Sequence, residues 1–230
     1  MALVDASEAA LRLLFSGDPE LWGIVAVSLS VSLRAMLLAM PIGIGIGYLL
    51  ATVDFPGRRP LIVVTQGLLA SPTVVVGLIL YLLLSRQGVF GQLQLLFTQT
   101  AMVIGQVLIA LPVLIAFSLA AIQGADPRAR ETAIALGAAD ARIAWTLLVE
   151  VRFALMAAVC SAFGRVVSEI GCSLMVGGNI AGVTRNIPTA IALETSKGEF
   201  AQGIALGIVL LLVALGINSA FAFFQGESRR

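Results

Sequence analysis

The stretch that decides the fold of this chain covers residues 98–123 and reads TQTAMVIGQVLIALPVLIAFSLAAIQ, without a single charged side chain. A helix needs roughly 20 mostly apolar residues to cross the ~30 Å hydrocarbon core of a membrane with its backbone groups hydrogen-bonded internally. Four other stretches are also long and mostly apolar, at about 21–53, 60–84, 146–176 and 200–224. The sequence therefore predicts an all-α, polytopic transmembrane helical bundle with about five core spans.

The overall composition excludes a water-soluble globule. Of the 230 residues, 59% are hydrophobic and only 12% are charged, and the mean hydropathy is +1.03. Soluble domains carry roughly 25% charged residues. The net charge of +1 gives no electrostatic basis for binding nucleic acid. The chain has no histidine, and Cys160 and Cys172 lie in the same span, so we predict neither a metal site nor a disulfide framework.

Basic residues predict the orientation, because they collect in cytoplasmic loops. One set of alternate connections holds seven of them: Arg58, Arg59, Arg128, Arg130, Arg142, Arg229 and Arg230. The other set holds four: Arg12, Arg86, Arg185 and Lys197. We therefore expect residues 1–20 to form an extracytoplasmic amphipathic segment, residues 21–225 to form the transmembrane domain, and residues 226–230 to form a cytoplasmic tail. Within the first span, Pro41 predicts a bend, and the neighbouring glycines 43, 45 and 47 favour close approach of another helix.

The connection at residues 124–145 predicts two short helices on the cytoplasmic side. Asp126 is a suitable N-cap, Pro127 suits the first helical position, and Gly137 suits a left-handed residue that ends the helix. Asp140 is expected to cap the second helix. From these residues alone, the segment could equally be a plain connector.

A family resemblance adds a function to this segment. The triplet Glu131-Thr132-Ala133, followed by Leu136-Gly137-Ala138, resembles the Glu-Ala-Ala loop of permease subunits of ATP-binding cassette (ABC) importers. Thr132 replaces the middle alanine, and Val149-Glu150 stands where a Leu-Pro pair is common. The resemblance implies a type I importer permease fold, in which this short helix docks into a groove of a cytoplasmic ATPase. The residues expected to make that coupling contact are Arg128, Ala129, Arg130, Glu131, Ala133, Leu136 and Gly137.

Two later segments suggest the substrate. Residues 164–171 and 177–191 resemble the molybdate and tungstate branch of these permeases, and residues 192–200 are closer to the tungstate type. The resemblance implies a path for an oxyanion, with tungstate first and molybdate or another oxyanion as the alternative. Positive charge and hydrogen-bond donors suit a tetrahedral oxyanion. The candidate pathway residues are Arg165, Ser168, Glu169, Asn179, Thr184 and Arg185.

Several of these charges have other possible roles. Arg165 and Glu169 lie four residues apart, so they could neutralise each other within the bundle. Arg185 could be only a solvated charge in an outer loop. Arg34 could reach toward the membrane surface, pair with Glu169 or contact a second copy of the chain.

The resemblance also implies partners. The chain is too short to enclose a wide path alone, so we expect a homodimer in a bacterial or archaeal plasma membrane. An extracytoplasmic oxyanion-binding protein would deliver the substrate. The chain contains no GxxxxGK[ST] phosphate loop, so ATP and Mg are expected in the partner ATPase, and no cofactor or enzymatic activity is expected here. A secondary transporter or channel that works without ATP is the alternative.

Overall fold

The computed structural model describes residues 8, 10–12 and 14–226, and every regular element in this part of the chain is helical. The elements from residue 19 onward are α2 (Pro19–Thr52), α3 (Arg58–Leu69), α4 (Thr73–Leu84), the 3-10 helix η1 (Gly91–Leu93), α5 (Gln99–Gln123), α6 (Pro127–Ala135), α7 (Asp140–Glu150), α8 (Arg152–Val167), α9 (Gly171–Gly177), α10 (Ile187–Lys197) and α11 (Phe200–Gly226). The all-α prediction is confirmed. Part of the predicted N-terminal segment, and residues 227–230 of the predicted tail, lie outside the described residues.

Three helices are long and apolar enough to cross a membrane unbroken: α2, α5 and Phe200–Ile217 of α11. Two more spans form only if bent pairs of helices are joined, with α3 and α4 at 104° and α7 and α8 at 70°. The described chain thus offers three to five spans, in agreement with the predicted bundle. The second and fourth spans differ from straight helices. The second breaks at residues 70–72, where Pro72 disfavours a helical conformation at Ser71.

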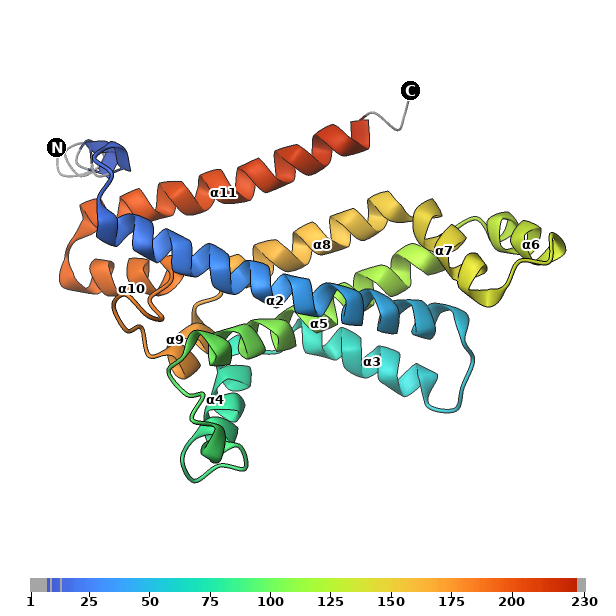
Figure 1. The fold of residues 1–230 in the computed structure, drawn as a ribbon, viewed down its shortest axis with the longest axis horizontal. Helices are drawn as coiled ribbons and strands as arrows, with labels where there is room; N and C mark the ends of the chain where they lie inside the picture. Colours follow the sequence, from blue (N-terminus) through green and yellow to red (C-terminus); the bar gives the residue numbers. More distant parts are fainter. Residues whose placement is uncertain (1–7, 9, 13, 227–230) are drawn as a thin grey trace.

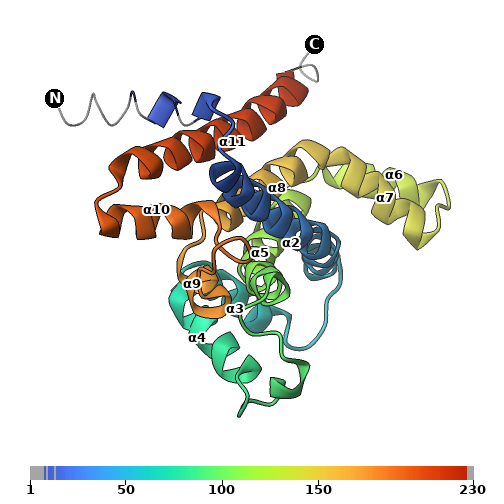
Figure 2. The same ribbon diagram turned by 60° about the vertical axis from the view of Figure 1, so that its left-hand side comes forward.

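The helices form an elongated bundle. In Figure 1, α2, α5, α8 and α11 run along the long axis of the molecule, whereas α4 stands across it. Figure 2 shows the same helices gathered around α5, with α4 and α9 on one side and α6 and α7 projecting at the other. The largest apolar cluster joins α2, α4, α5, α8 and α9 through buried residues such as Val31, Leu80, Leu114, Val166 and Cys172. α5 is therefore the central helix of the fold.

Close packing of α2 on α5 depends on two glycines. A Cβ atom added to Gly43 would lie 2.5 Å from Leu114 Cβ, and one added to Gly47 would lie 2.7 Å from Ser118 Cβ. Gly45 has nothing within 4 Å of such an atom. Gly43 and Gly47 therefore allow the close approach that the sequence predicted. α2 continues through Pro41 to Thr52, and the bend at this residue stays a prediction.

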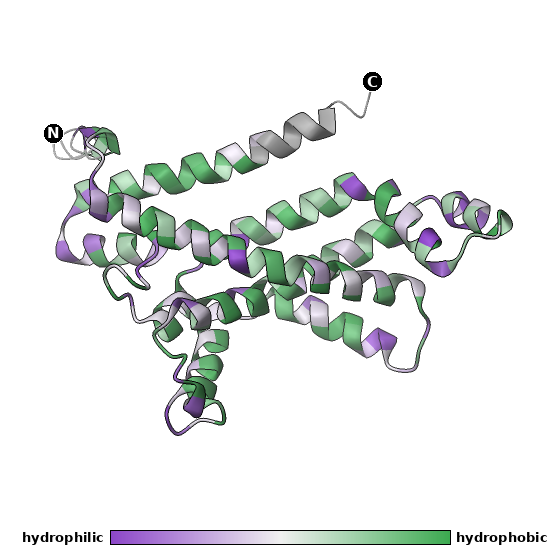
Figure 3. Ribbon diagram, viewed as in Figure 1, coloured by the Kyte–Doolittle hydropathy of each residue, from purple (hydrophilic) through white to green (hydrophobic). Residues whose placement is uncertain are grey.

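The polar segments lie at the ends of the bundle. Figure 3 shows apolar residues along the helices and hydrophilic ones around α6, α7 and the terminal connections. The α2–α3 loop, α6 and the end of α11 all lie at one end of the molecule in Figure 1. These are the segments that the distribution of basic residues groups on one side of the membrane. The fold is thus compatible with the predicted orientation.

Candidate functional site

The short helix α6 is defined by its two ends. Asp126 Oδ1 accepts a hydrogen bond from the Arg128 backbone N–H at 2.9 Å, and Pro127 occupies the first turn. At the other end, Gly137 has a φ of +71°, and the Ala138 N–H donates to the Ala133 carbonyl at 3.0 Å. These contacts form the left-handed helix end that glycine favours. Both predicted ends of α6 are confirmed.

The predicted cap of α7 is wrong by one position. Ala139 is the N-cap residue and has no side-chain hydrogen bond, whereas Asp140 is already the first residue of the helix. The extended backbone conformation that precedes a helix falls on Ala139, with ψ of 153°. The Asp140 carboxylate lies in the first turn, where it is favourably placed in the field of the helix dipole.

The helix α6 projects from the bundle and has no buried residue. Leu136 is 81% exposed, and Trp145 on α7 is 65% exposed. An open hollow lies between the two helices. Its lining includes four of the predicted coupling residues, Arg128, Ala129, Ala133 and Leu136, together with Thr132, Ala138, Arg142 and Thr146. Glu131 and Arg130 are exposed without lining it. A projecting helix with large exposed apolar side chains is typical of a protein interface.

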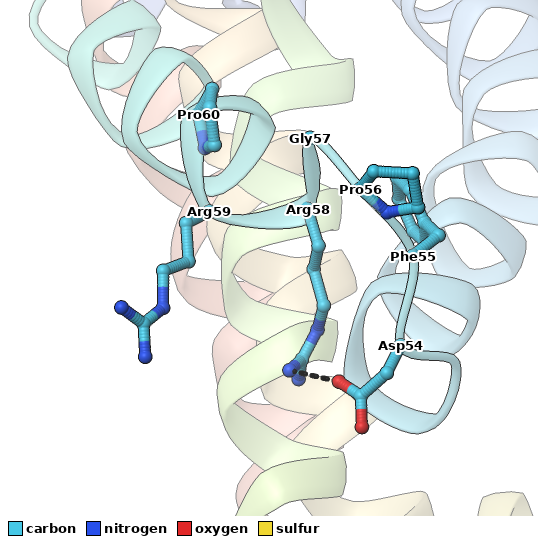
Figure 4. Close-up of a pocket in the computed structure, with 7 residues that line it drawn as sticks. All are labelled: Asp54, Phe55, Pro56, Gly57, Arg58, Arg59 and Pro60. Carbon is cyan, nitrogen blue, oxygen red and sulfur yellow. Dashed lines mark hydrogen bonds and ion pairs between the residues drawn. The ribbon is translucent and has the colours of Figure 1, made fainter.

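A second hollow at the same end of the molecule lies at the turn between α2 and α3 (Figure 4). Arg58 donates to the Leu50 carbonyl at 2.7 Å and to an Asp54 carboxylate oxygen at 2.8 Å. Its guanidinium therefore satisfies backbone carbonyls at the C-terminus of α2, where a positive charge is favoured. Arg59 points away from these groups in Figure 4. Arg58 has a structural role in this turn.

The first group of predicted pathway residues lies where α8 ends and α9 begins. Arg165 and Ser168 are exposed, and Glu169 is buried, with only 5% of its surface accessible. The Glu169 carboxylate accepts a hydrogen bond from the Cys172 N–H at 2.9 Å. Among the described residues, neither a hydrogen bond nor an ion pair involves the Arg165 side chain. The proposed mutual neutralisation of Arg165 and Glu169 is therefore wrong, because α8 ends at Val167 before the two side chains can share one helical face.

The second group lies in the loop between α9 and α10. Thr184 is fully buried, and its hydroxyl donates to the Gly177 carbonyl at 2.6 Å and accepts from the Ile180 N–H at 3.0 Å. Asn179 has a φ of +51° and donates to the Thr189 carbonyl at 3.5 Å. Thr184 thus ties the loop to the end of α9, and Asn179 ties it to the first turn of α10. Any contact of theirs with substrate remains a prediction.

Arg185 ties this loop to the start of the first span. Its Nη1 atom lies 3.3 Å from a Glu20 carboxylate oxygen, and its side chain is only 14% exposed. Its Nε atom is buried and has no partner within the described part of the chain. The alternative of a simply solvated charge is therefore wrong. The side chain joins α2 to the outer loop across 165 positions of sequence.

Arg34 belongs to a further link that the sequence did not reveal. Its guanidinium donates to the Gln99 side-chain oxygen and to the Ser30 carbonyl. The Gln99 amide in turn donates to the Val183 carbonyl at 2.8 Å. This chain of hydrogen bonds connects α2, the start of α5 and the outer loop. No ion pair joins Arg34 to Glu169 in the described structure.

The fold is similar to that of a known transporter subunit. The chain matches a chain in the crystal structure of a bacterial alginate ABC transporter bound to an alginate pentasaccharide-loaded periplasmic protein, with a TM-score of 0.74 and 18% sequence identity. The match covers 100% of this chain and 88% of the other. This likeness establishes the fold, which is that of a chain of an ABC transporter.

Sequence comparison identifies the family, although no protein-family profile matches the chain. A probable anion ABC transporter permease of Haloferax volcanii is 40% identical over 210 residues, which are 89% of this chain and 90% of that protein. The tungstate uptake system permease protein TupB of Campylobacter jejuni is 39% identical over 94% of this chain and 90% of its own length. The molybdenum transport system permease protein ModB of Escherichia coli K12 is 30% identical over 91% of this chain and 96% of its own length.

These comparisons confirm the family predicted from the sequence. The chain belongs to the ABC transporter permeases of the molybdate and tungstate type. It is a multi-pass membrane permease for oxyanions and the non-catalytic part of its transporter.

Proposed function

We propose that two copies of this chain form the translocation path of an ABC importer whose preferred substrate is tungstate. Separate cytoplasmic ATPase subunits bind ATP and Mg and hydrolyse the nucleotide. An extracytoplasmic binding protein delivers the oxyanion to the outer loops. The single observation that carries this proposal is the projecting helix α6, which is unburied and ends in the exposed Leu136, in a chain of this permease family.

Identity favours tungstate over molybdate. Two relatives that are named tungstate uptake permeases are 39% and 34% identical, and they align with 94% and 98% of this chain. The molybdenum permease of Escherichia coli is 30% identical. Residues 192–200, which resemble the tungstate type, form the end of α10 and the turn into α11. Molybdate is the alternative that the transport experiment below must distinguish.

The connections of α6 support its coupling role. It follows α5 after a short turn at residues 124–126, and it packs on α7, which leads through a 70° bend into α8. α5 and α8 also pack against each other in the centre of the bundle. A force applied to α6 by an ATPase therefore reaches both helices through short, helical connections. In this mechanism, closure of the ATPase subunits on ATP moves α5 and α8 and changes which side of the membrane the path faces.

Arg165 supports a path between two copies of the chain. It lies on α8 within a predicted span, is exposed in the single chain and has no described partner. An unpaired charge in lipid is costly, so intramembrane arginines face water or another protein surface. A second copy and the path between the copies supply that environment.

The test is ATP-dependent uptake by a reconstituted complex of this permease, its ATPase and its binding protein. We expect uptake of radiolabelled tungstate that is blocked by excess unlabelled tungstate, less by molybdate and least by sulfate. A preference for molybdate would replace tungstate as the proposed substrate but would leave the proposed importer function standing. Uptake by the permease alone, without ATPase or ATP, would contradict the importer and support a secondary transporter or channel.

A further inference from the structure

The break in the second span lies next to a cavity. This cavity, of about 200 Å³, is formed where α3 ends, α4 begins and α5 and α8 pass by. Its polar side chains are Ser71, Thr73 and Arg165, and its other lining residues are aliphatic or proline. Among the described residues, none that lines it carries a carboxylate. The cavity is several times larger than the ~30 Å³ that one water molecule takes up in the liquid, so it has room for a small polyatomic ion.

The backbone at this cavity is irregular within the second predicted span. Residues 70–72 separate α3 from α4, and the two helices meet at 104°. Such backbone is tolerated within the hydrocarbon region only where it is buried in protein or lines a water-filled cavity. Secondary transporters commonly place such breaks at their substrate sites. Residues 70–72 are exposed or half-buried in the single chain, so the break fits the second of these cases. This observation is independent of the charge on Arg165.

The donors at this cavity suit an anion. The Arg165 guanidinium carries five N–H donors, and neither it nor the Thr73 hydroxyl has a hydrogen-bond partner among the described residues. The Ser71 hydroxyl already donates to the Leu68 carbonyl at 2.8 Å. α4 begins at Thr73 without a side-chain cap, so its first backbone N–H groups add to the positive field. Arg165 and Thr73 are thus the two side chains free to bind.

We propose that Arg165 and Thr73 form a transient binding station for the transported oxyanion at the break between α3 and α4. This inference rests on the proposed function and adds a specific site to it. The candidate pathway residues predicted from the sequence did not include Thr73, and the sequence did not predict the break between α3 and α4. The guanidinium supplies charge and paired donors, the hydroxyl supplies a third donor, and the absence of a carboxylate in the lining avoids repulsion. The aliphatic walls offer no further polar contacts, so binding stays weak enough for release.

The test compares matched variants in the reconstituted importer. We expect Arg165→Ala to lower tungstate uptake by about tenfold or more, and Arg165→Lys to retain part of it, because charge without paired donors binds less well. Thr73→Val is expected to lower uptake by about threefold, as for the loss of one hydrogen bond, whereas Thr73→Ser retains it. The control is Ser161→Ala, one turn before Arg165 on α8, whose hydroxyl donates only to the Ala157 carbonyl.

The outcomes separate the station from the proposed function. Wild-type uptake by both Arg165→Ala and Thr73→Val would overturn the station and leave the importer intact. Absence of any oxyanion uptake by the wild-type complex would overturn the importer and the station together. If Arg165→Ala fails to copurify with the ATPase, the comparison of Thr73→Val with Thr73→Ser decides whether the station exists. Equal uptake by that pair counts against the station, and a selective loss in the valine variant supports it.

Discussion

The Glu169 carboxylate accepts the backbone N–H of Cys172 at 2.9 Å and forms no ion pair with Arg165, four residues earlier in the sequence. The carboxylate thus holds the first turn of α9, and the arginine is left available for another partner. Glu169 is buried, so loss of its oxygen would strand a backbone donor away from water.

Variants of Glu169 test this assignment. Glu169→Ala should destabilise the protein by about 1–3 kcal/mol, because the Cys172 N–H loses its acceptor. Glu169→Gln should cost clearly less, since its amide oxygen can still accept that hydrogen bond. Thermal unfolding of the purified protein in detergent measures both effects. Equal destabilisation by the two variants, relieved by adding Arg165→Ala, would instead indicate an ion pair.

The packing of α2 on α5 gives a second prediction. Gly43→Ala places a Cβ atom 2.5 Å from Leu114 Cβ, and overpacking of this kind costs about 1–3 kcal/mol. Gly45→Ala, two residues away, has open space and should leave the midpoint of thermal unfolding unchanged or slightly raised. A Gly43→Ala protein as stable as the Gly45→Ala protein would show that this contact does not limit the packing of the two helices.

The outer loop gives a third prediction. Thr184→Val removes a buried hydroxyl that both donates and accepts, and leaving its partners unsatisfied should cost about 1–3 kcal/mol. Thr184→Ser should restore most of the stability. Thermal unfolding and proteolysis of the loop are the measurements. If Thr184 served only to contact substrate, the valine variant would unfold at the wild-type temperature and would lose uptake alone.

The end of α6 gives a fourth prediction. Gly137 has a φ of +71°, a conformation that costs a branched residue about 1–2 kcal/mol but that asparagine tolerates. Gly137→Val should therefore displace the end of the helix and reduce tungstate uptake per ATP hydrolysed by about tenfold. The Gly137→Asn variant should take up nearly as much tungstate per ATP hydrolysed as the wild-type protein. An unchanged ratio in the valine variant, with the ATPase still bound, would argue against coupling through this segment.

Local signals predicted local structure well. The uncharged stretch around α5 required a spanning helix, and Asp126, Pro127 and Gly137 defined α6 because their effects act within one turn. The same reasoning misplaced the cap of α7 by one residue, since the N-cap is the last residue with an extended backbone before the helix, and here that residue is Ala139. Hydropathy detected the second span but not the 104° change of direction between its two helices. The Ser71-Pro72 pair was the available signal for that break.

Long-range contacts were beyond the reach of the sequence. Pairing of Arg165 with Glu169 was one of two possibilities, because a continuous helix would align them, but α8 ends at Val167. The Arg185–Glu20 contact joins segments that only the folded bundle brings together. The link from Arg34 through Gln99 is of the same kind. Spacing rules describe neighbours within one helix, so they cannot identify partners on different helices.

The account depends most on α6 receiving the ATPase on the cytoplasmic side. A photocrosslinking amino acid at the exposed position Leu136, introduced into the assembled transporter in cells, tests this directly. The control position is Leu93 of η1, which is 59% exposed and follows α4 along the chain, and Figure 1 shows α4 well separated from α6. The account predicts an ATPase adduct from position 136 and none from position 93. Absence of that adduct, together with labelling of Leu136→Cys by a membrane-impermeant reagent added outside the cell, would contradict it.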